Sequence, residues 1–188
     1  HSVDSTIALA THIGHGTMVR PSTPILTMRG RAQSLLQGER IALNFLQRLS
    51  GISTLTHQFC EAVRDYPVAI VDTRKTTPGL RALEKWAVRL GGGKNHRFSL
   101  HDGILIKDNH LLIMASQRMN IKQTCLRARQ HAPHGLRICV EVETVAQVRQ
   151  AMKGKADVLL LDNMTPDQVR QAISIIQGRA LVEVSGGI

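Results

Sequence analysis

Aromatic residues are scarce in this chain, whose 188 positions hold one Trp, one Tyr and three Phe. Proteins that read nucleic-acid bases usually stack them on exposed aromatic side chains, so the composition argues against that class. No apolar run approaches the roughly 20 residues that span a bilayer. The first residues also lack the basic-then-apolar pattern of a signal peptide, and they indicate a chain cut from something longer. We therefore expect neither nucleic acid nor a membrane as a partner.

Cysteine is also rare, and its pattern does not predict disulfides or metal binding. Cys60, Cys125 and Cys139 are odd in number, far apart and set among apolar neighbours, which is typical of small core residues. Such free cysteines suit a reducing cytoplasm. The nine histidines form no H-E-x-x-H motif and no Cys/His zinc spacing, so zinc is not expected.

Acidic residues are outnumbered: 14 Asp and Glu face 24 Lys and Arg, and the formal net charge is +10. No block of five like charges occurs, which excludes a basic tail. The excess could serve a small polyanionic substrate or an anionic surface. A basic nucleic-acid-binding module, which would bind in a strongly salt-dependent way, is the alternative from another class. The few aromatics argue against it.

Short apolar runs alternate with helix-like stretches after residue 67. The runs are 68–71, 104–106, 138–140, 158–161 and 181–184, and the helical stretches are 79–90, 121–131, 145–153 and 166–177. Spacings of about 20 to 25 residues between the last three runs predict strand–helix units of a parallel sheet. The Val, Ile and Leu content of the runs favours strands buried on both faces.

Every apolar run is followed by polar residues at its carboxyl end. In α/β barrels the active site is built there from several strands at once, although a doubly wound sheet also binds ligands at that edge. The regular rhythm favours an α/β fold with an incomplete TIM-like barrel. Five runs do not close a barrel, so the last strands are expected to be missing from the chain given.

The first sixty residues differ from this rhythm. Residues 25–31 alternate like a half-buried strand, and 33–49 and 52–63 predict two helices broken by Ser50-Gly51. Arg40 lies on a partly apolar stripe of the first helix, either as a snorkelling side chain or presented to an anion across a subunit interface. We predict a partial N-terminal α+β domain with linking helices at 1–66 and a barrel catalytic domain at 67–188.

Cations gather at the predicted strand ends. Arg74 and Lys75 follow the first run, Lys107 follows the second, and His96 and Arg97 lie in a connecting segment. Each by itself could be a solvated surface residue. Together they would repel one another, each pair by on the order of 1 kcal/mol, unless a multiply charged anion such as a carboxylate or phosphate neutralises them.

Two acids and a glycine pair complete the predicted rim. Glu141 and Asp162 follow neighbouring runs and could hold Mg²⁺ shared with a phosphate, or pair with the lysines as a structural network; Glu143 is the less favoured acid. Ser185-Gly186-Gly187 could offer backbone N–H groups to a phosphate or form a plain turn. The G-G-G-K-N segment at 91–95 lacks the Ser or Thr of a P-loop and follows a helix, so an NTPase is rejected.

In order and approximate spacing, seven segments resemble the quinolinate phosphoribosyltransferase family. They are ERIALNFLQRLSGIST (39–54), DTRKTTPGLR (72–81), GGGKNHR (91–97), KDNH (107–110), VEVE (140–143), LDNM (161–164) and VEVSGGI (182–188). The resemblance runs from about Gly30 to Ile188. It implies a type II phosphoribosyltransferase: a barrel of fewer than eight strands beside a small α/β domain, in a homodimer whose site the neighbouring subunit completes.

The resemblance also implies a reaction and a set of roles. Quinolinate and phosphoribosyl pyrophosphate (PRPP) would give nicotinate mononucleotide, pyrophosphate and CO₂ in de novo NAD biosynthesis, with Mg²⁺. Arg40 would come from the partner subunit. The quinolinate-binding residues would be Thr73, Arg74, Lys75, His96, Arg97 and Lys107. Glu141 and Asp162 would hold the ribose hydroxyls and Mg²⁺, and Ser185, Gly186 and Gly187 the 5′-phosphate. Lys75, Lys107, Glu141 and Asp162 are the expected catalytic residues.

Two further alternatives remain at this point. A paralogous transferase on the same fold could act on another acid or base. A folded fragment could also be inactive, because a further glycine-containing phosphate loop follows in the family.

Overall fold

The structure, a computed structural model, describes residues 3–187, and the chain forms two compact units that meet in sequence at Phe98 and Ser99. The domain boundary predicted at residues 66 and 67 stays a prediction. Among the described residues, no helix is both long and apolar enough to cross a bilayer.

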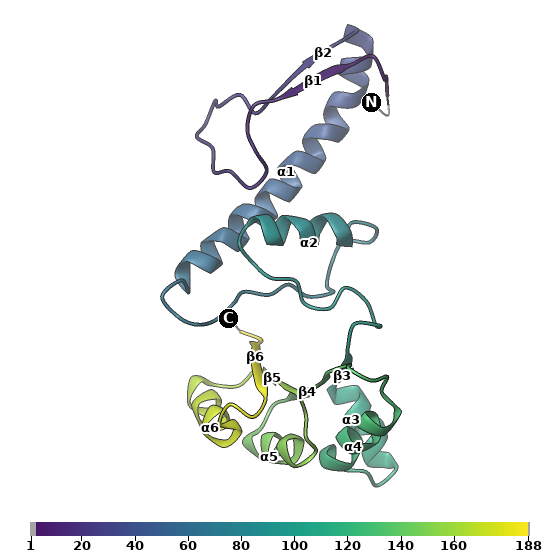
Figure 1. Ribbon diagram of the computed structural model, residues 1–188, viewed down its shortest axis with the longest axis vertical. Coiled ribbons are helices and arrows are strands. Elements are labelled where there is room, and N and C mark those ends of the chain that lie inside the picture. The colour runs from purple at the N-terminus through teal and green to yellow at the C-terminus, as the bar shows by residue number, and fades with distance from the viewer. Residues whose placement is uncertain (1–2, 188) are drawn as a thin grey trace. The chain divides into compact units, whose positions relative to one another are not determined.

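The second unit contains a four-stranded sheet with helices between its strands (Figure 1). The elements are β3 (Ile104–Ile106), α3 (Asp108–Ser116), α4 (Ile121–His131), β4 (Ile138–Val142), α5 (Val145–Lys153), β5 (Val158–Asp162), α6 (Pro166–Ile176) and β6 (Leu181–Ser185). All strand pairs are parallel. The predicted α/β alternation is confirmed here, whereas α3 was not predicted.

The strand order indicates an arc of a barrel. Neighbouring strands follow the chain as β3-β4-β5-β6, without the reversal that marks the switch point of a doubly wound sheet. Helices α4, α5 and α6 lie on the same side of the sheet (Figure 1). One helix layer outside and strands in sequential order are the arrangement of an α/β barrel wall.

The core of this unit lies between the sheet and its helices. Val140 and Leu159 are fully buried, as are Cys125 of α4 and Ala151 of α5. Burial of a Val or Leu side chain contributes roughly 1.5–3 kcal/mol to the stability of the fold. Burial also raises the pKa of the Cys125 thiol to about 11, so this cysteine serves packing.

The expectation of strands buried on both faces is right for part of the sheet only. β4 and β5 are largely buried, but β6 exposes Leu181 and Val184 to 55% and 44% of their surface. In the part of the chain that is described, β6 pairs with β5 alone, so its outer edge lacks the neighbours that cover β4.

Local capping explains where the helices begin. The Thr144 hydroxyl accepts a hydrogen bond from the Gln147 N–H at 3.2 Å, and Thr165 accepts one from Gln168 at 3.3 Å. Both caps satisfy backbone donors that a first helical turn leaves unpaired.

The first unit joins a β-hairpin to two helices. β1 (Ala8–Thr11) pairs antiparallel with β2 (Leu26–Arg29), and α1 (Ala32–Ala62) and α2 (Arg81–Leu90) follow. The Asp4 carboxylate accepts the Ser34 hydroxyl at 2.7 Å and so ties the N-terminal segment to α1. Hydrogen bonds from Thr6 and Ser34 lower the pKa of Asp4 to about 2.

The predicted helix break at Ser50-Gly51 is wrong, because α1 runs without interruption through 31 residues. A single glycine costs a helix only about 1 kcal/mol, and packing against the segment after α2 outweighs it. This packing is close: a Cβ at Gly91 would stand 2.3 Å from the Ser53 carbonyl oxygen and 2.7 Å from the Cβ of buried Thr56.

The strand predicted at Val68–Val71 is also wrong. Only Val71 forms a parallel bridge, with Lys94, and the run is exposed, Val68 to 60% and Val71 to 42%. The bridge still matters for the site. It holds the segment that enters the 72–79 loop beside the segment that carries His96 and Arg97.

Candidate active site

The parallel register of the second unit brings its predicted site residues to one edge and one face of the sheet. Val140 and Leu161 point into the helix-facing core. Side chains alternate along a strand, so Glu141 and Asp162 project from the opposite face. Lys107 continues from buried Ile106 with extended backbone at φ −106°, and Asp162 is paired in register with Ser185. This edge is the carboxyl end of all four strands.

Hydrogen bonds fix the Asp162 carboxylate. Its Oδ1 accepts the Ser185 hydroxyl at 2.6 Å, and its Oδ2 accepts the Asn163 side-chain amide at 2.8 Å. The Asn163 backbone N–H donates to the Ser185 carbonyl at 2.9 Å. Asp162 is therefore held in one orientation by Ser185, the last residue of β6, and by its own neighbour Asn163.

The two glycines after Ser185 are required by the geometry of that loop. Gly186 and Gly187 have φ of +82° and +66°, a backbone region that side-chain-bearing residues adopt at a cost. A Cβ at Gly186 would also lie 2.1 Å from Asn163 Oδ1. Only glycine lets the backbone pass this close to Asn163, which hydrogen-bonds to Asp162.

The surroundings of Glu141 at this edge disfavour its charged form. Burial raises the pKa of Glu141, Lys107 partly offsets the rise, and the negative charge of Asp162 adds to it. A further cation would relieve this repulsion. Among residues 3–187 no group of three or more His, Cys, Asp or Glu is arranged to hold a metal. Two carboxylates suffice for Mg²⁺ only when substrate phosphates complete its coordination.

In the first unit, the side chain of Arg81 hydrogen-bonds to the 72–79 loop. The Arg81 guanidinium donates to the Arg74 carbonyl at 3.2 Å and to the Thr76 hydroxyl at 3.1 Å. The Thr73 hydroxyl accepts the Lys75 N–H at 3.0 Å. The backbone that carries Thr73, Arg74 and Lys75 is therefore anchored by hydrogen bonds, while the side chains of Thr73 and Lys75 stay exposed.

A buried carboxylate secures the far end of the same loop. Glu84 accepts Arg48 at 2.6 Å through Oε1 and the Thr77 N–H at 3.1 Å through Oε2. Burial raises the pKa of Glu84, but hydrogen bonds from Arg48 and Thr77 outweigh burial and hold it below its usual value. Arg48 thus links α1 to the loop and to α2.

The loop and the segment after α2 share a third anchor. The Asp72 carboxylate accepts the backbone N–H of His96 at 2.8 Å and the ammonium of Lys85. Thr73, Arg74 and Lys75 are thereby tied to the segment of His96 and Arg97 within one unit. Arg40 lies on α1 as an exposed side chain.

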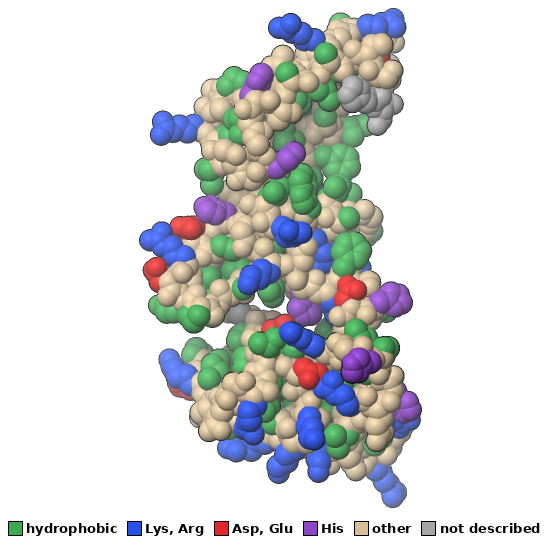
Figure 2. All heavy atoms as spheres, viewed as in Figure 1, with side chains coloured by type: hydrophobic (Ala, Val, Ile, Leu, Met, Phe, Trp, Pro, Cys, Tyr) green, Lys and Arg blue, Asp and Glu red, His purple; other side chains and the backbone are tan. Residues whose placement is uncertain are grey.

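Apart from Arg40 on α1, the predicted residues thus form two groups, one in each unit. Thr73, Arg74, Lys75, His96 and Arg97 belong to the first, and Lys107, Glu141, Asp162, Ser185, Gly186 and Gly187 to the second. Basic side chains are not confined to them: Lys and Arg also cover much of the visible surface of the helices α4–α6 (Figure 2). Exposed Lys122, Arg127, Arg149 and Lys153 lie there, so part of the +10 charge belongs to an outer surface.

Sequence reasoning missed the residues that support the site. Arg48, Arg81, Glu84 and Lys85 hold the 72–79 loop, and Asn163 orients Asp162. A signal existed in α2, because residues 81, 84, 85 and 88 share one helix face by i, i+3, i+4, i+7 spacing. Three of these four residues are charged, yet Glu84 and Lys85 on this face of α2 are buried in the first unit.

The sequence prediction also left out Glu183. This residue is paired in register with Leu160, which is paired with Glu141, so Glu183 and Glu141 lie on the same face of the sheet.

Comparison with known proteins assigns the chain to a family. The models for the C-terminal and N-terminal domains of quinolinate phosphoribosyl transferase match residues 52–188 and 5–50. The chain belongs to the quinolinate phosphoribosyl transferase family. The resemblance inferred from the sequence motifs is confirmed.

Members of this family similar to the chain are found among bacteria. A probable nicotinate-nucleotide pyrophosphorylase (carboxylating) of Bacillus subtilis strain 168 is 46% identical over 186 residues, which are 99% of this chain and 63% of the relative. A protein of Synechocystis with the same description is 44% identical over 93% of the chain and 59% of its own length. The chain spans about six tenths of the length of these curated relatives.

Solved structures of the family share the fold. The crystal structure of NadC from Streptococcus pyogenes matches with a TM-score of 0.91 and 41% identity, over 100% of this chain and 65% of that protein. The predicted fold class, a type II phosphoribosyltransferase α/β fold, is confirmed.

Proposed function

We propose that this protein acts as a quinolinate phosphoribosyltransferase (carboxylating nicotinate-nucleotide pyrophosphorylase), a pentosyltransferase of de novo NAD biosynthesis. It would convert quinolinate and PRPP to nicotinate mononucleotide, pyrophosphate and CO₂. The observation that carries the proposal is the family match, which extends over residues 5–50 and 52–188. The motif residues of both matched parts are present, and within each unit they lie on backbone that is fixed by hydrogen bonds.

The cations would bind quinolinate. Its two adjacent carboxylates call for positive groups at fixed spacing, and Arg74, Lys75, His96 and Arg97 are supplied by the two segments joined through Asp72. Arginine can grip a carboxylate with two hydrogen bonds, whereas lysine acts as a point charge. Thr73 would add a hydroxyl, and Lys107, at the carboxyl end of β3, a further ammonium group.

The edge formed by β4, β5 and β6 would bind PRPP. We assign Glu141 and the orientated carboxylate of Asp162 to the ribose hydroxyls and to Mg²⁺. Exposed Gly186 and Gly187, with Ser185, would place backbone N–H groups against the 5′-phosphate. Bound Mg²⁺ would supply positive charge to the pyrophosphate. A cation there would offset the burial and the Asp162 charge that raise the pKa of Glu141.

The protein's part in the chemistry would be positional and electrostatic. The pyridine nitrogen bonds to C1 of the ribose as the C1–O bond to pyrophosphate breaks, through an oxocarbenium-like state that the Glu141 and Asp162 carboxylates face. The quaternised ring then takes up the electron pair when the adjacent carboxylate leaves as CO₂, and the ring carbon gains a proton. Lys75 and Lys107 would hold the substrate carboxylates during both steps. No covalent nucleophile is needed.

We further propose a homodimer in which Arg40 reaches the substrate of the partner subunit. Exposed Ile41 and Phe45 lie near Arg40 on α1, at 62% and 41% of their surface. Apolar side chains this exposed favour coverage by another protein surface. The three free cysteines support a reducing compartment, the cytoplasm.

The assay is quinolinate-dependent CO₂ release in the presence of PRPP and Mg²⁺. We expect Arg74→Ala and Lys107→Ala to lower kcat/KM by on the order of 100-fold, because each removes a charge that contacts the substrate. Exposed Arg89 and Lys153 provide matched controls, and Arg89→Ala and Lys153→Ala should keep wild-type rates. Wild-type kcat/KM in both site variants would refute their assignment. Absence of product with quinolinate, but turnover of another acid, would refute the substrate.

A further inference from the structure

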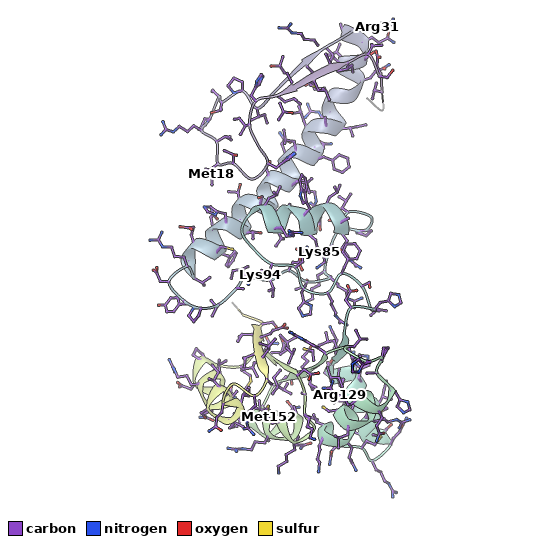
Figure 3. The ribbon with its side chains drawn as sticks, viewed as in Figure 1. Met18, Arg31, Lys85, Lys94, Arg129 and Met152 are labelled. Atoms are coloured by element: carbon purple, nitrogen blue, oxygen red, sulfur yellow. The ribbon has the colours of Figure 1, made fainter. Side chains whose placement is uncertain are left out.

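Lys85 is a lysine in the interior of the first unit. Its side chain is 2% exposed and the side chain of its partner Asp72 is 8% exposed. The Lys85 ammonium donates to Asp72 Oδ1 and, at 3.2 Å, to the backbone carbonyl of His96. Figure 3 labels Lys85 on α2, on the side that faces the segment of Lys94.

Both oxygens of the Asp72 carboxylate accept hydrogen bonds. Oδ1 also accepts the His96 N–H at 2.8 Å. With the Asn95 amide turned so that its nitrogen faces these acceptors, it donates to Asp72 Oδ2 and to the Lys85 carbonyl, each at 2.9 Å. One carboxylate thus joins three segments: the start of the 72–79 loop, helix α2 and residues 94–97.

Stability alone does not account for such a pair. Burying two charges costs desolvation, and apolar side chains of similar size often replace a buried ion pair without loss of stability. The pair does provide geometry that apolar packing lacks, because directional hydrogen bonds set the distance between the backbones at Asp72 and His96.

We propose that Asp72 is a positioning residue that fixes the spacing of the quinolinate-binding cations, with Lys85 as the buried counter-charge of its carboxylate; this inference rests on the proposed function. Arg74 and Lys75 follow Asp72 by two and three positions, and Arg97 follows His96 directly. The backbone bridge between Val71 and Lys94 brings the two cationic segments together, and the hydrogen bond from the His96 N–H to Asp72 sets their separation beyond the bridge, where the cations lie. Lys85 also neutralises Asp72, whose charge would otherwise compete with a substrate carboxylate for these cations.

Two double variants separate positioning from stability. Asp72→Leu with Lys85→Met replaces the ion pair by apolar side chains and removes the acceptor for the His96 N–H. Asp72→Asn with Lys85→Met is equally uncharged but keeps a carbonyl oxygen at that position. The first should raise the KM for quinolinate at least 10-fold, with the KM for PRPP and kcat at saturating quinolinate within about 2-fold, because misplaced cations weaken substrate binding. The second should restore the KM to within about 3-fold of wild type.

Each outcome decides the proposal. A folded Leu/Met variant with wild-type KM for quinolinate overturns it, as does an Asn/Met variant no better than Leu/Met. If Leu/Met does not fold, Asn95→Ala serves instead: Asn95 is exposed, and its loss should raise the same KM about 2- to 5-fold, whereas no change overturns the proposal. A wild-type protein that does not turn over quinolinate refutes the proposed function, a result distinct from an unchanged variant of an active enzyme.

Discussion

Replacement of Gly186 by alanine tests whether the loop after β6 holds Asp162 in place. The new side chain meets two obstacles. With φ at +82°, the added Cβ costs about 1–2 kcal/mol. It would also stand 2.1 Å from Asn163 Oδ1, so Asn163 must move and release Asp162, which costs about 1 kcal/mol for an exposed hydrogen bond. We expect Gly186→Ala to lower the free energy of unfolding by about 2–3 kcal/mol.

Gly187→Ala is the matched control. Its φ is also positive, at +66°, but nothing lies within 4 Å of an added Cβ. This variant should lose only the backbone part, about 1–2 kcal/mol. The measurement is denaturant unfolding of both variants, together with the KM for PRPP. We expect Gly186→Ala to raise that KM at least 10-fold, because Asp162 loses one of the two hydrogen bonds that orient it, and by more than Gly187→Ala does. Equal unfolding energies and equal KM values for the two variants would refute this reasoning.

Two further predictions concern carboxylates. The folded-state pKa of Glu141 is raised, so its charge weakens the fold as pH rises above the ordinary value. Glu141→Gln should therefore raise Tm near neutral pH, with a difference that vanishes in acid, while lowering kcat on the order of 100-fold; an unchanged Tm would contradict the raised pKa. The folded-state pKa of Glu84 is lowered from 4.5, so its contribution is complete above that value and is lost as pH falls below it. Arg48→Met should cost about 1–2 kcal/mol of unfolding free energy near pH 7, and the cost should shrink toward pH 3; an equal cost at both pH values would show that Glu84 is not the cause.

Local sequence determined much of the second unit. The apolar runs at β3, β4, β5 and β6 are strands, and the helices between them begin at the capping threonines Thr144 and Thr165. These features depend on neighbours a few residues away, so a single sequence reveals them. The polar residues of the candidate site in this unit also follow the strands directly. Because parallel strands run in the same direction, their carboxyl ends meet at one edge of the sheet, and the sequence alone could place these residues there.

Tertiary contacts decided what the sequence pattern could not. Packing of Thr56 against Gly91 keeps α1 continuous where Ser50-Gly51 predicted a break, since a propensity cost near 1 kcal/mol is smaller than the packing gained. The run at Val68–Val71 reads as a strand but finds only one bridge. The burial of Lys85 against Asp72 could not be read locally, because a lysine in a helix normally lies in water. Its partner is 13 residues away, and only the fold brings the two charges together.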